Sequence, residues 1–230
     1  MNDMYTNTSL GVTFKKYMTT VYSWMFLGVM ITFLVAYAFG TSFNLIYTLV
    51  SIPMIDWILL IAQLGIVLAL SARLMNFSST MVKVLFIAYS ILTGVSFSYL
   101  PLIFGVRTIF SAFLITSIFF ACLAFIGHTT NMDLTKLGTF CIAGIMALVA
   151  YTLLAVLFKW NVNTFIYSII GLVLFLGLTA YDVQKMKKYY LAFAHDEVML
   201  NKLGIYSALD LYLDFINIFL YVIRLIGKKD

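Results

Sequence analysis

A stripe of polar residues runs along the last apolar segment of the chain, residues 203–226. Its members recur at alternating spacings of three and four, which places them on one face of a helix. They are Ser207, Asp210, Asp214, Asn217, Tyr221 and Arg224. A carboxylate at membrane depth costs roughly 2.5 to 3.5 kcal/mol on insertion scales, so such residues usually face a bundle interior or a water path. The stripe therefore predicts a segment in the centre of a helical bundle.

The composition places the whole chain in a bilayer. Of its 230 residues, 63% are hydrophobic and 10% are charged, and the mean hydropathy is +1.05. Soluble domains carry about 25% charged residues. The net charge of +5 could indicate a nucleic-acid partner, but the basic residues are scattered over short loops and helix ends. We therefore expect an integral membrane protein in contact with lipid, without a nucleic-acid partner.

Seven apolar runs are long enough to cross about 30 Å of hydrocarbon. The expected spans are 19–40, 55–72, 81–102, 107–127, 137–158, 164–183 and 203–226. The connections are short apart from residues 182–202, which leaves no room for a soluble domain. Residues 1–230 are thus expected to form a single integral membrane domain. Its predicted fold is an all-α bundle of seven transmembrane helices with the last, polar helix in the centre.

The basic residues predict the orientation of these spans. With the amino terminus in the cytoplasm, most basic loop residues lie inside, and only Arg107 and Lys159 lie in outside loops. The inside set is Lys15, Lys16, Arg73, Lys83, Lys136, Lys185, Lys187, Lys188 and Lys202. The carboxyl tail, with Arg224, Lys228 and Lys229, lies outside if the last segment crosses fully, and inside if that segment enters and returns. Charge counting leaves both alternatives open.

Small residues inside the spans predict packing contacts. Ser90, Gly94 and Ser98 recur every four residues in the third span, a spacing that lets helices approach closely. Cys122 and Cys141 fall within apolar runs, where we expect small packing residues and no disulfide.

Four charged residues lie within or at the end of three of the expected spans and form a candidate functional group. Asp182 closes the sixth span, Arg73 ends the second, and Asp210 and Asp214 lie within the seventh. A guanidinium near these carboxylates could lock the inner end of the bundle. A buried ion pair without any moving part is the alternative.

Two segments resemble a known family. They are Gly-Leu-Thr-Ala-Tyr-Asp at 177–182 and Ala-Leu-Asp-Leu-Tyr-Leu-Asp-Phe-Ile-Asn-Ile-Phe at 208–219. Both are similar to the most characteristic segments of the transmembrane Bax inhibitor motif family, in its bacterial form, and the length and Arg73 fit the same family. The resemblance implies six helices around a seventh and a pH-sensitive calcium leak. In that family the counterparts of Asp182 and Asp214 form a paired sensor and that of Arg73 acts as its latch, whereas Asp210 occupies a position that is acidic in only some members.

The chemistry of such a pair follows from electrostatics. Two carboxylates that share a hydrogen bond cannot both ionise easily, so protonation belongs to the pair and its charge changes with pH. A charged pair holds Arg73, and protonation releases it. Calcium prefers oxygen ligands, so the three aspartates are also candidates for weak calcium binding, with calcium as the transported ion and no other cofactor. The candidate pore-lining residues are Ser207, Asp210 and Asn217, and the candidate calcium ligands are Asp182, Asp210 and Asp214.

Other functional classes fit the sequence less well. An intramembrane aspartyl protease could use Tyr181-Asp182, but the second aspartate follows Leu211-Tyr212-Leu213 instead of Gly-x-Gly. A retinal protein needs a lysine in the last span, and 203–226 contains none. We therefore expect no enzyme. The main alternative is a membrane regulator without transport activity that binds a membrane protease or stress and cell-death partners.

The location follows from the first span, which is too long for a signal-peptide core and lacks a cleavage pattern. A bacterial plasma membrane is the expected location. A eukaryotic internal membrane is the alternative, because the lysines near the end faintly resemble a retrieval signal.

Overall fold

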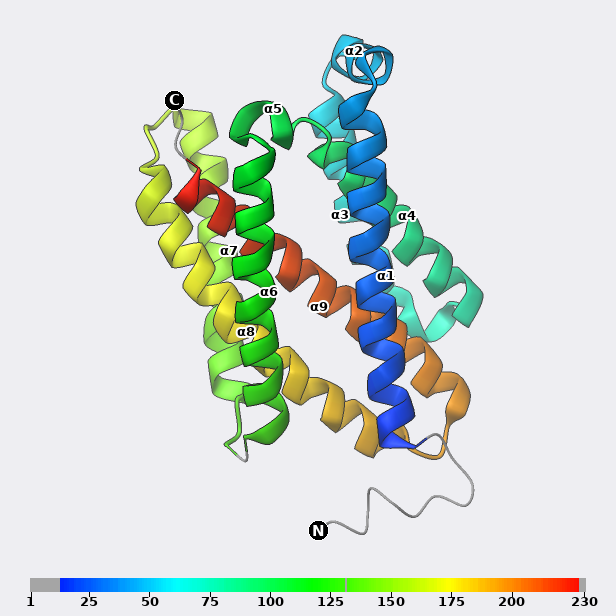
Figure 1. The fold of residues 1–230 in the computed structure, drawn as a ribbon. Coiled ribbons are helices and arrows are strands. Elements are labelled where there is room, and N and C mark those ends of the chain that lie inside the picture. The colour runs from blue at the N-terminus through cyan, green and yellow to red at the C-terminus, as the bar shows by residue number, and fades with distance from the viewer. Residues whose placement is uncertain (1–12, 131, 228–230) are drawn as a thin grey trace. The chain divides into compact units, whose positions relative to one another are not determined.

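The computed structural model describes residues 13–130 and 132–227, and their regular structure is helical throughout (Figure 1). The helices are α1 (Phe14–Thr41), α2 (Phe43–Ser51), α3 (Ile55–Arg73), the 3-10 helix η2 (Leu74–Asn76), α4 (Ser79–Phe97), α5 (Leu100–Phe104), α6 (Val106–Thr129), α7 (Thr135–Phe158), α8 (Thr164–Phe193) and α9 (Glu197–Ile226). The predicted all-α class is therefore confirmed for the described residues. The tail lysines Lys228 and Lys229 lie outside these residues, so the side on which the tail lies stays a prediction.

Six helical segments of the described chain are long and apolar enough to cross a membrane. They are Phe14–Thr41, Ile55–Asn76, Ser79–Phe104, Val106–Thr129, Thr135–Phe158 and Thr164–Phe193. Each contains the whole of one expected span. The seventh expected span, 203–226, falls within α9, which is not among these six. A membrane protein with several apolar helices is therefore confirmed, and the seventh crossing stays a prediction.

The region between the last two expected spans differs from the prediction. A long connection was expected at 182–202, but α8 continues to Phe193 and α9 already begins at Glu197. A search for apolar runs misses these turns because they are rich in lysine and tyrosine, which helices tolerate. Asp196 marks the start of α9, because its Oδ1 accepts a hydrogen bond from the Met199 backbone N–H at 2.8 Å. Glu197 in the first turn adds a favourable interaction with the helix dipole.

The helices form two compact units, which are described separately. Unit 1 comprises Met1–Ile103 and Lys188–Tyr212, and unit 2 comprises Phe104–Lys187 and Leu213–Asp230. Helices α8 and α9 each contribute residues to both units. The prediction of one domain over residues 1–230 is not tested by this division and stays a prediction.

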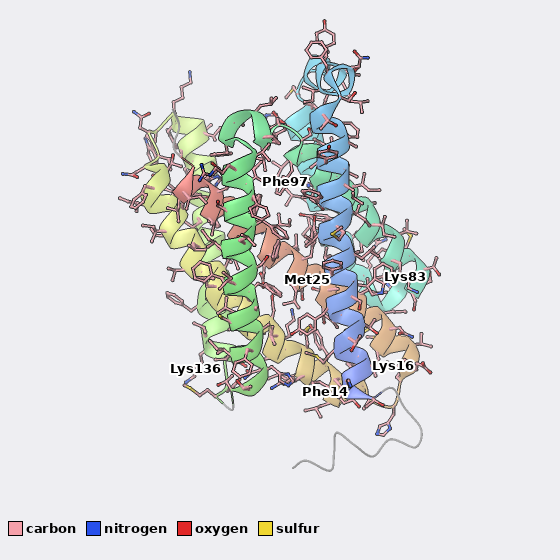
Figure 2. The ribbon with its side chains drawn as sticks, viewed as in Figure 1. Phe14, Lys16, Met25, Lys83, Phe97 and Lys136 are labelled. Carbon is pink, nitrogen blue, oxygen red and sulfur yellow. The ribbon has the colours of Figure 1, made fainter. Side chains whose placement is uncertain are left out.

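In unit 1, α1 packs closely against α4. A Cβ added at Gly94 would lie 2.8 Å from the backbone oxygen of Thr32 and 2.7 Å from Cβ of Val35. Ser90 and Ser98 are also buried, so the predicted packing role of this small-residue stripe is confirmed. Figure 2 labels Lys83 on α4. Its Nζ lies 5.8 Å from the centre of the Trp24 ring of α1.

A hydroxyl chain connects α1, α4 and α9 within unit 1. The Thr32 hydroxyl donates to the backbone oxygen of Ser90 at 3.0 Å, and the Tyr212 hydroxyl lies 2.6 Å from the same Thr32 oxygen. Since the single Thr32 proton points to Ser90, Tyr212 is the donor in the second bond. Edge-on contacts with Phe86 and Tyr89 hold the Tyr212 ring. The first part of α9 is thereby anchored by a satisfied polar contact in an apolar setting.

In unit 2, α8 packs against α6 and α7 at glycine positions. A Cβ at Gly127 of α6 would lie 2.6 Å from the backbone oxygen of Ala180, and a Cβ at Gly138 of α7 would overlap the Tyr181 ring. One at Gly177 of α8 would lie 2.7 Å from Sγ of Cys141. Cys141 is buried, as a packing residue should be, whereas Cys122 is exposed on α6, and both are free thiols. These contacts fix the backbone of α8 along the stretch that ends at Asp182.

Candidate functional site

The polar stripe of α9 divides into two rows that differ in burial. No residue from 203 to 223 is exposed. Residues seven apart on a helix lie almost directly above one another, so the stripe contains two parallel rows. Ser207, Asp214 and Tyr221 form the buried row, whereas Asp210 and Asn217 are half-buried and Arg224 is exposed. The sequence placed all six on one face, and only the fold separates the buried row from the other.

Unit 2 contains the two predicted sensor carboxylates. Asp182 lies on α8 and is 7% exposed, and Asp214 lies on α9 and is 2% exposed. Carboxylates are almost never buried to this extent unless another group interacts with them. Nζ of Lys185, one turn further along α8, lies 3.5 Å from Oδ1 of Asp182. Lys185, a residue of the same helix, is thus an ion-pair partner of Asp182. This role of Lys185 was not predicted from the sequence.

Gln184 ties α8 to the connection between α6 and α7. Its Nε2 donates to the backbone oxygen of Met132 at 2.7 Å, and its Oε1 accepts from the backbone N–H of Leu134 at 2.9 Å. The side chain is buried, so both bonds form away from water. Gln184 lies two residues after Asp182, and this two-point contact steadies the turn of α8 that carries the carboxylate. A single glutamine has no spacing signal, so the sequence could not indicate this role.

Aromatic contacts hold the second part of α9 in unit 2. The Phe215 ring lies 5.6 Å from that of Phe113 and 5.9 Å from that of Phe120, both on α6. The Tyr221 ring lies 5.9 Å from that of Phe175 on α8 and rests against Gly171 of the same helix. Asp214, next to Phe215, is therefore carried by a helix segment that packs tightly on both α6 and α8.

The remaining predicted site residues belong to unit 1 or to the half-buried row. Arg73 ends α3 with an exposed side chain, and Ser207 is buried with its hydroxyl 3.4 Å from that of Tyr17. Asp210 also belongs to unit 1, and Asn217 to unit 2, where its Nδ2 donates to the backbone oxygen of Leu213. Because Arg73 and Asp182 belong to different units, the arginine latch stays a prediction.

The described residues contain no group of three or more His, Cys, Asp or Glu side chains placed to hold a metal ion. Calcium binding by Asp182, Asp210 and Asp214 accordingly stays a prediction. A weak site for a passing ion would need fewer protein ligands than a resident calcium, which takes six to eight oxygens.

These features define a class, a helical integral membrane protein with two buried carboxylates on its last two helices. Residues 14–230 match the family model described as inhibitor of apoptosis-promoting Bax1. The chain belongs to this Bax inhibitor family, which confirms the resemblance drawn from residues 177–182 and 208–219.

Relatives from several bacteria cover nearly the whole chain. A protein of Rickettsia prowazekii is 37% identical over 97% of this chain and 96% of its own length. The inner membrane protein YbhL of Escherichia coli K12 is 34% identical over 94% of this chain and 92% of its own length. A membrane protein of Streptococcus pyogenes serotype M1 is 30% identical over 100% of both chains. The expected location as an integral protein of a bacterial plasma membrane is confirmed.

Proposed function

We propose that this protein is a pH-sensitive calcium leak channel in which Asp182 and Asp214 form the sensor and Arg73 acts as a latch. The observation that carries the proposal is the burial of both carboxylates within one unit, on two helices that pack tightly there. Buried ionisable groups in a membrane protein usually mark an ion path or a proton relay. Membership of the Bax inhibitor family supports the same function.

In this proposal the chain crosses the membrane seven times with its amino terminus in the cytoplasm, and α9 is the central helix. The burial of α9 from residue 203 to residue 223 supports this arrangement, because a helix at the rim would present one face to lipid. A cysteine introduced at residue 229, in a chain without Cys122 and Cys141, tests it. Labelling from outside is expected, whereas labelling only after permeabilisation would mean that α9 enters and returns.

The gate works through the charge of the carboxylate pair. At high pH the pair is negative and attracts Arg73, whose guanidinium stays protonated throughout. Acidification neutralises the pair, the attraction is lost, and the leak increases. Nζ of Lys185 lies 3.5 Å from Oδ1 of Asp182, so a second positive charge is present beside the pair on α8.

Calcium flux from the purified chain in liposomes tests this function directly. The leak is expected to rise as pH falls from about 8 to about 6, because protonation of the proposed carboxylate pair removes the attraction for Arg73. Asp182→Asn and Asp214→Asn should each abolish the pH response while keeping the side-chain shape. Glu197→Gln is the matched control, because this carboxylate is exposed in the first turn of α9.

A second variant tests the latch. Arg73→Ala should raise the leak at high pH and flatten its pH dependence, since it removes the cation that the charged pair attracts. Flux that falls on acidification in both the parent chain and Arg73→Ala would contradict the latch and indicate aspartates that act as simple calcium ligands. Absence of flux under all conditions would contradict the channel and favour a membrane regulator that acts by binding a membrane protease or other partners.

A further inference from the structure

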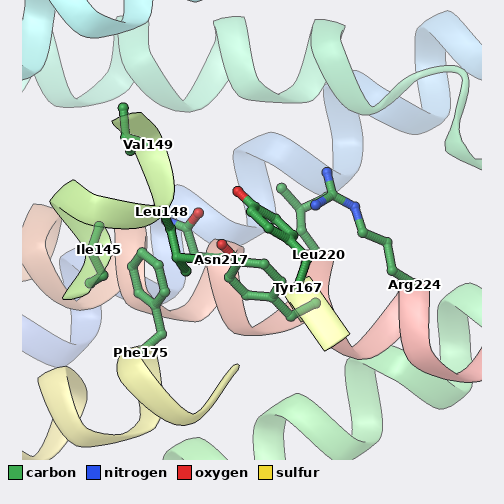
Figure 3. A pocket seen from close by; sticks show the side chains of 9 residues that line it. Ile145, Leu148, Val149, Tyr167, Phe175, Asn217, Leu220 and Arg224 are labelled. Carbon is green, nitrogen blue, oxygen red and sulfur yellow. The ribbon is translucent and has the colours of Figure 1, made fainter. Parts of the chain in front are cut away.

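A cavity of about 230 Å³ lies wholly within unit 2, among α7, α8 and α9. Its two ends differ in chemistry (Figure 3). Ile145, Val149 and Phe175 line one end, and Arg224 stands at the other. Asn217 also lines the cavity. An enclosure that is apolar at one end and cationic at the other matches a ligand that is itself amphipathic and anionic.

Arg224 provides the cationic end. It lies in the last turn of α9, is exposed, and stands with its guanidinium 5.9 Å from the centre of the Tyr221 ring. Within the part of the chain that the structure describes, it takes part in no ion pair. Guanidinium groups bind phosphate through two parallel hydrogen bonds, and a contact with the face of a ring uses none of their N–H groups.

The apolar end adjoins the lipid-facing surface of α7. Val149 lines the cavity and is still 49% exposed, and Met146 and Leu153, about one turn before and after it, are exposed as well. A hydrocarbon chain can therefore enter from the bilayer without crossing a polar surface. A water molecule in the liquid occupies about 30 Å³. On this scale the cavity has room for part of one acyl chain and not for a whole lipid.

The walls of the cavity are held in place by contacts that need no ligand. The Tyr167 hydroxyl lies 3.0 Å from the hydroxyl oxygen of Thr152, whose own proton is directed to the backbone oxygen of Leu148. On the other side, Gly171 allows the Tyr221 ring to lie directly against the backbone of α8. A preformed site binds without first having to order its walls.

We propose that this cavity binds an anionic membrane phospholipid, with the phosphate at Arg224 and one acyl chain against Ile145, Val149 and Phe175. The lipid then lies against the last turns of α9 and against α7 and α8. Asn217, a candidate pore-lining residue, also lines this cavity, whereas Asp182 and Asp214 do not. The test of the proposal does not depend on calcium transport.

Native mass spectrometry of the purified full-length chain in non-ionic detergent tests the site. Dioleoyl phosphatidylglycerol is titrated against dioleoyl phosphatidylcholine, and oleate is titrated separately as a free fatty acid. We expect one phosphatidylglycerol to bind with higher affinity than phosphatidylcholine. Arg224→Gln should weaken phosphatidylglycerol binding about tenfold, in line with the loss of one charge-assisted phosphate contact. Arg107→Gln is the matched control, because Arg107 is an exposed arginine of unit 2 that does not line the cavity.

A third variant examines the apolar end. Val149→Trp fills the cavity and should weaken binding of both phospholipids, and circular dichroism shows whether the helices remain intact. If this variant does not fold, the comparison of Arg224→Gln with Arg107→Gln still tests whether the cavity binds phosphatidylglycerol. Equal losses in those two variants, or equal affinity for the two phospholipids, would overturn the site. Binding of oleate without phosphatidylglycerol would overturn the assignment of the ligand as a phospholipid.

Discussion

Unit 1 and unit 2 bury their polar side chains in different ways. In unit 1 the buried groups are neutral and hydrogen-bonded, as in the chain of hydroxyl contacts through Thr32, Tyr212 and the Ser90 backbone. In unit 2 the buried groups include two carboxylates, Asp182 and Asp214. A neutral, satisfied network stabilises one packing arrangement, whereas buried carboxylates respond to protons and cations.

Two hydroxyls extend this contrast. Thr116 on α6 and Ser168 on α8 are fully buried in unit 2, and neither hydroxyl has a hydrogen-bond partner among the described residues. A buried polar group without a partner costs about 1–3 kcal/mol, so its persistence calls for a water, an ion or a functional reason. The difference teaches that the buried polar groups of unit 1 are neutral, whereas both buried carboxylates and both unpartnered hydroxyls belong to unit 2.

The largest expected effect comes from replacing one carboxylate in each of the two rows of α9 and comparing the two variants. Asp214→Asn should reduce the ratio of calcium leak at pH 6 to leak at pH 8 by on the order of tenfold or more, because it removes a titratable charge of the proposed sensor pair. Asp210→Asn should change it much less, because Asp210 is half-buried in unit 1. Liposome flux at pH 8 and pH 6 measures both. Loss of the pH response in Asp210→Asn alone would reverse the ranking of Asp214 above Asp210. It would also contradict the contrast drawn between unit 2 and unit 1.

The next effect concerns helix packing, which both units achieve with glycines. Gly127→Ala in unit 2 and Gly94→Ala in unit 1 should each lower stability by about 1–3 kcal/mol, because the new methyl group meets a backbone oxygen that cannot turn away. Gly65→Ala is the control, since a Cβ there has no other atom within 4 Å. Thermal unfolding in detergent measures all three. An unchanged melting temperature in Gly127→Ala would contradict the close approach of α6 and α8.

A smaller effect is expected from the hydroxyl chain of unit 1. Tyr212→Phe removes the bond to Thr32 while keeping the ring contacts, so stability should fall by about 1 kcal/mol. Calcium leak and its pH dependence should not change, because no charge is altered. Tyr151→Phe, on an exposed residue of α7, is the control for losing a hydroxyl. A flux change specific to Tyr212→Phe would show that unit 1 also takes part in gating.

The smallest effect on stability is expected from the two hydroxyls without partners. Thr116→Val and Ser168→Ala each remove a polar atom that makes no hydrogen bond to the described residues. The free energy of unfolding should therefore fall by no more than about 0.5 kcal/mol, or should rise. Thermal unfolding in detergent again provides the measurement. A loss well above this value would show that a bound water or ion satisfies the hydroxyl, and that unit 2 is hydrated.

Much of the helix layout could be predicted from the sequence. Apolar runs indicated six segments that the structure makes helical and membrane-compatible, and small residues such as Gly94 indicated close packing. The continuation of α8 to Phe193 was missed because those turns are not apolar, although Asp196 offered a helix-start signal. The ion pair of Lys185 with Asp182 follows a spacing of three that is common on helix surfaces, so it could have been noticed.

The sequence by itself determined the membrane class, the six apolar helical segments and the family. In lipid every backbone polar group must be satisfied within its own segment, so a long apolar run has essentially one structure available to it. Only the tertiary structure decided which polar residues of α9 are buried, how Gln184 holds the α6–α7 connection, and which helices enclose the cavity at Arg224. These features depend on contacts between helices far apart in the chain, and neither composition nor spacing specifies which helix faces become neighbours.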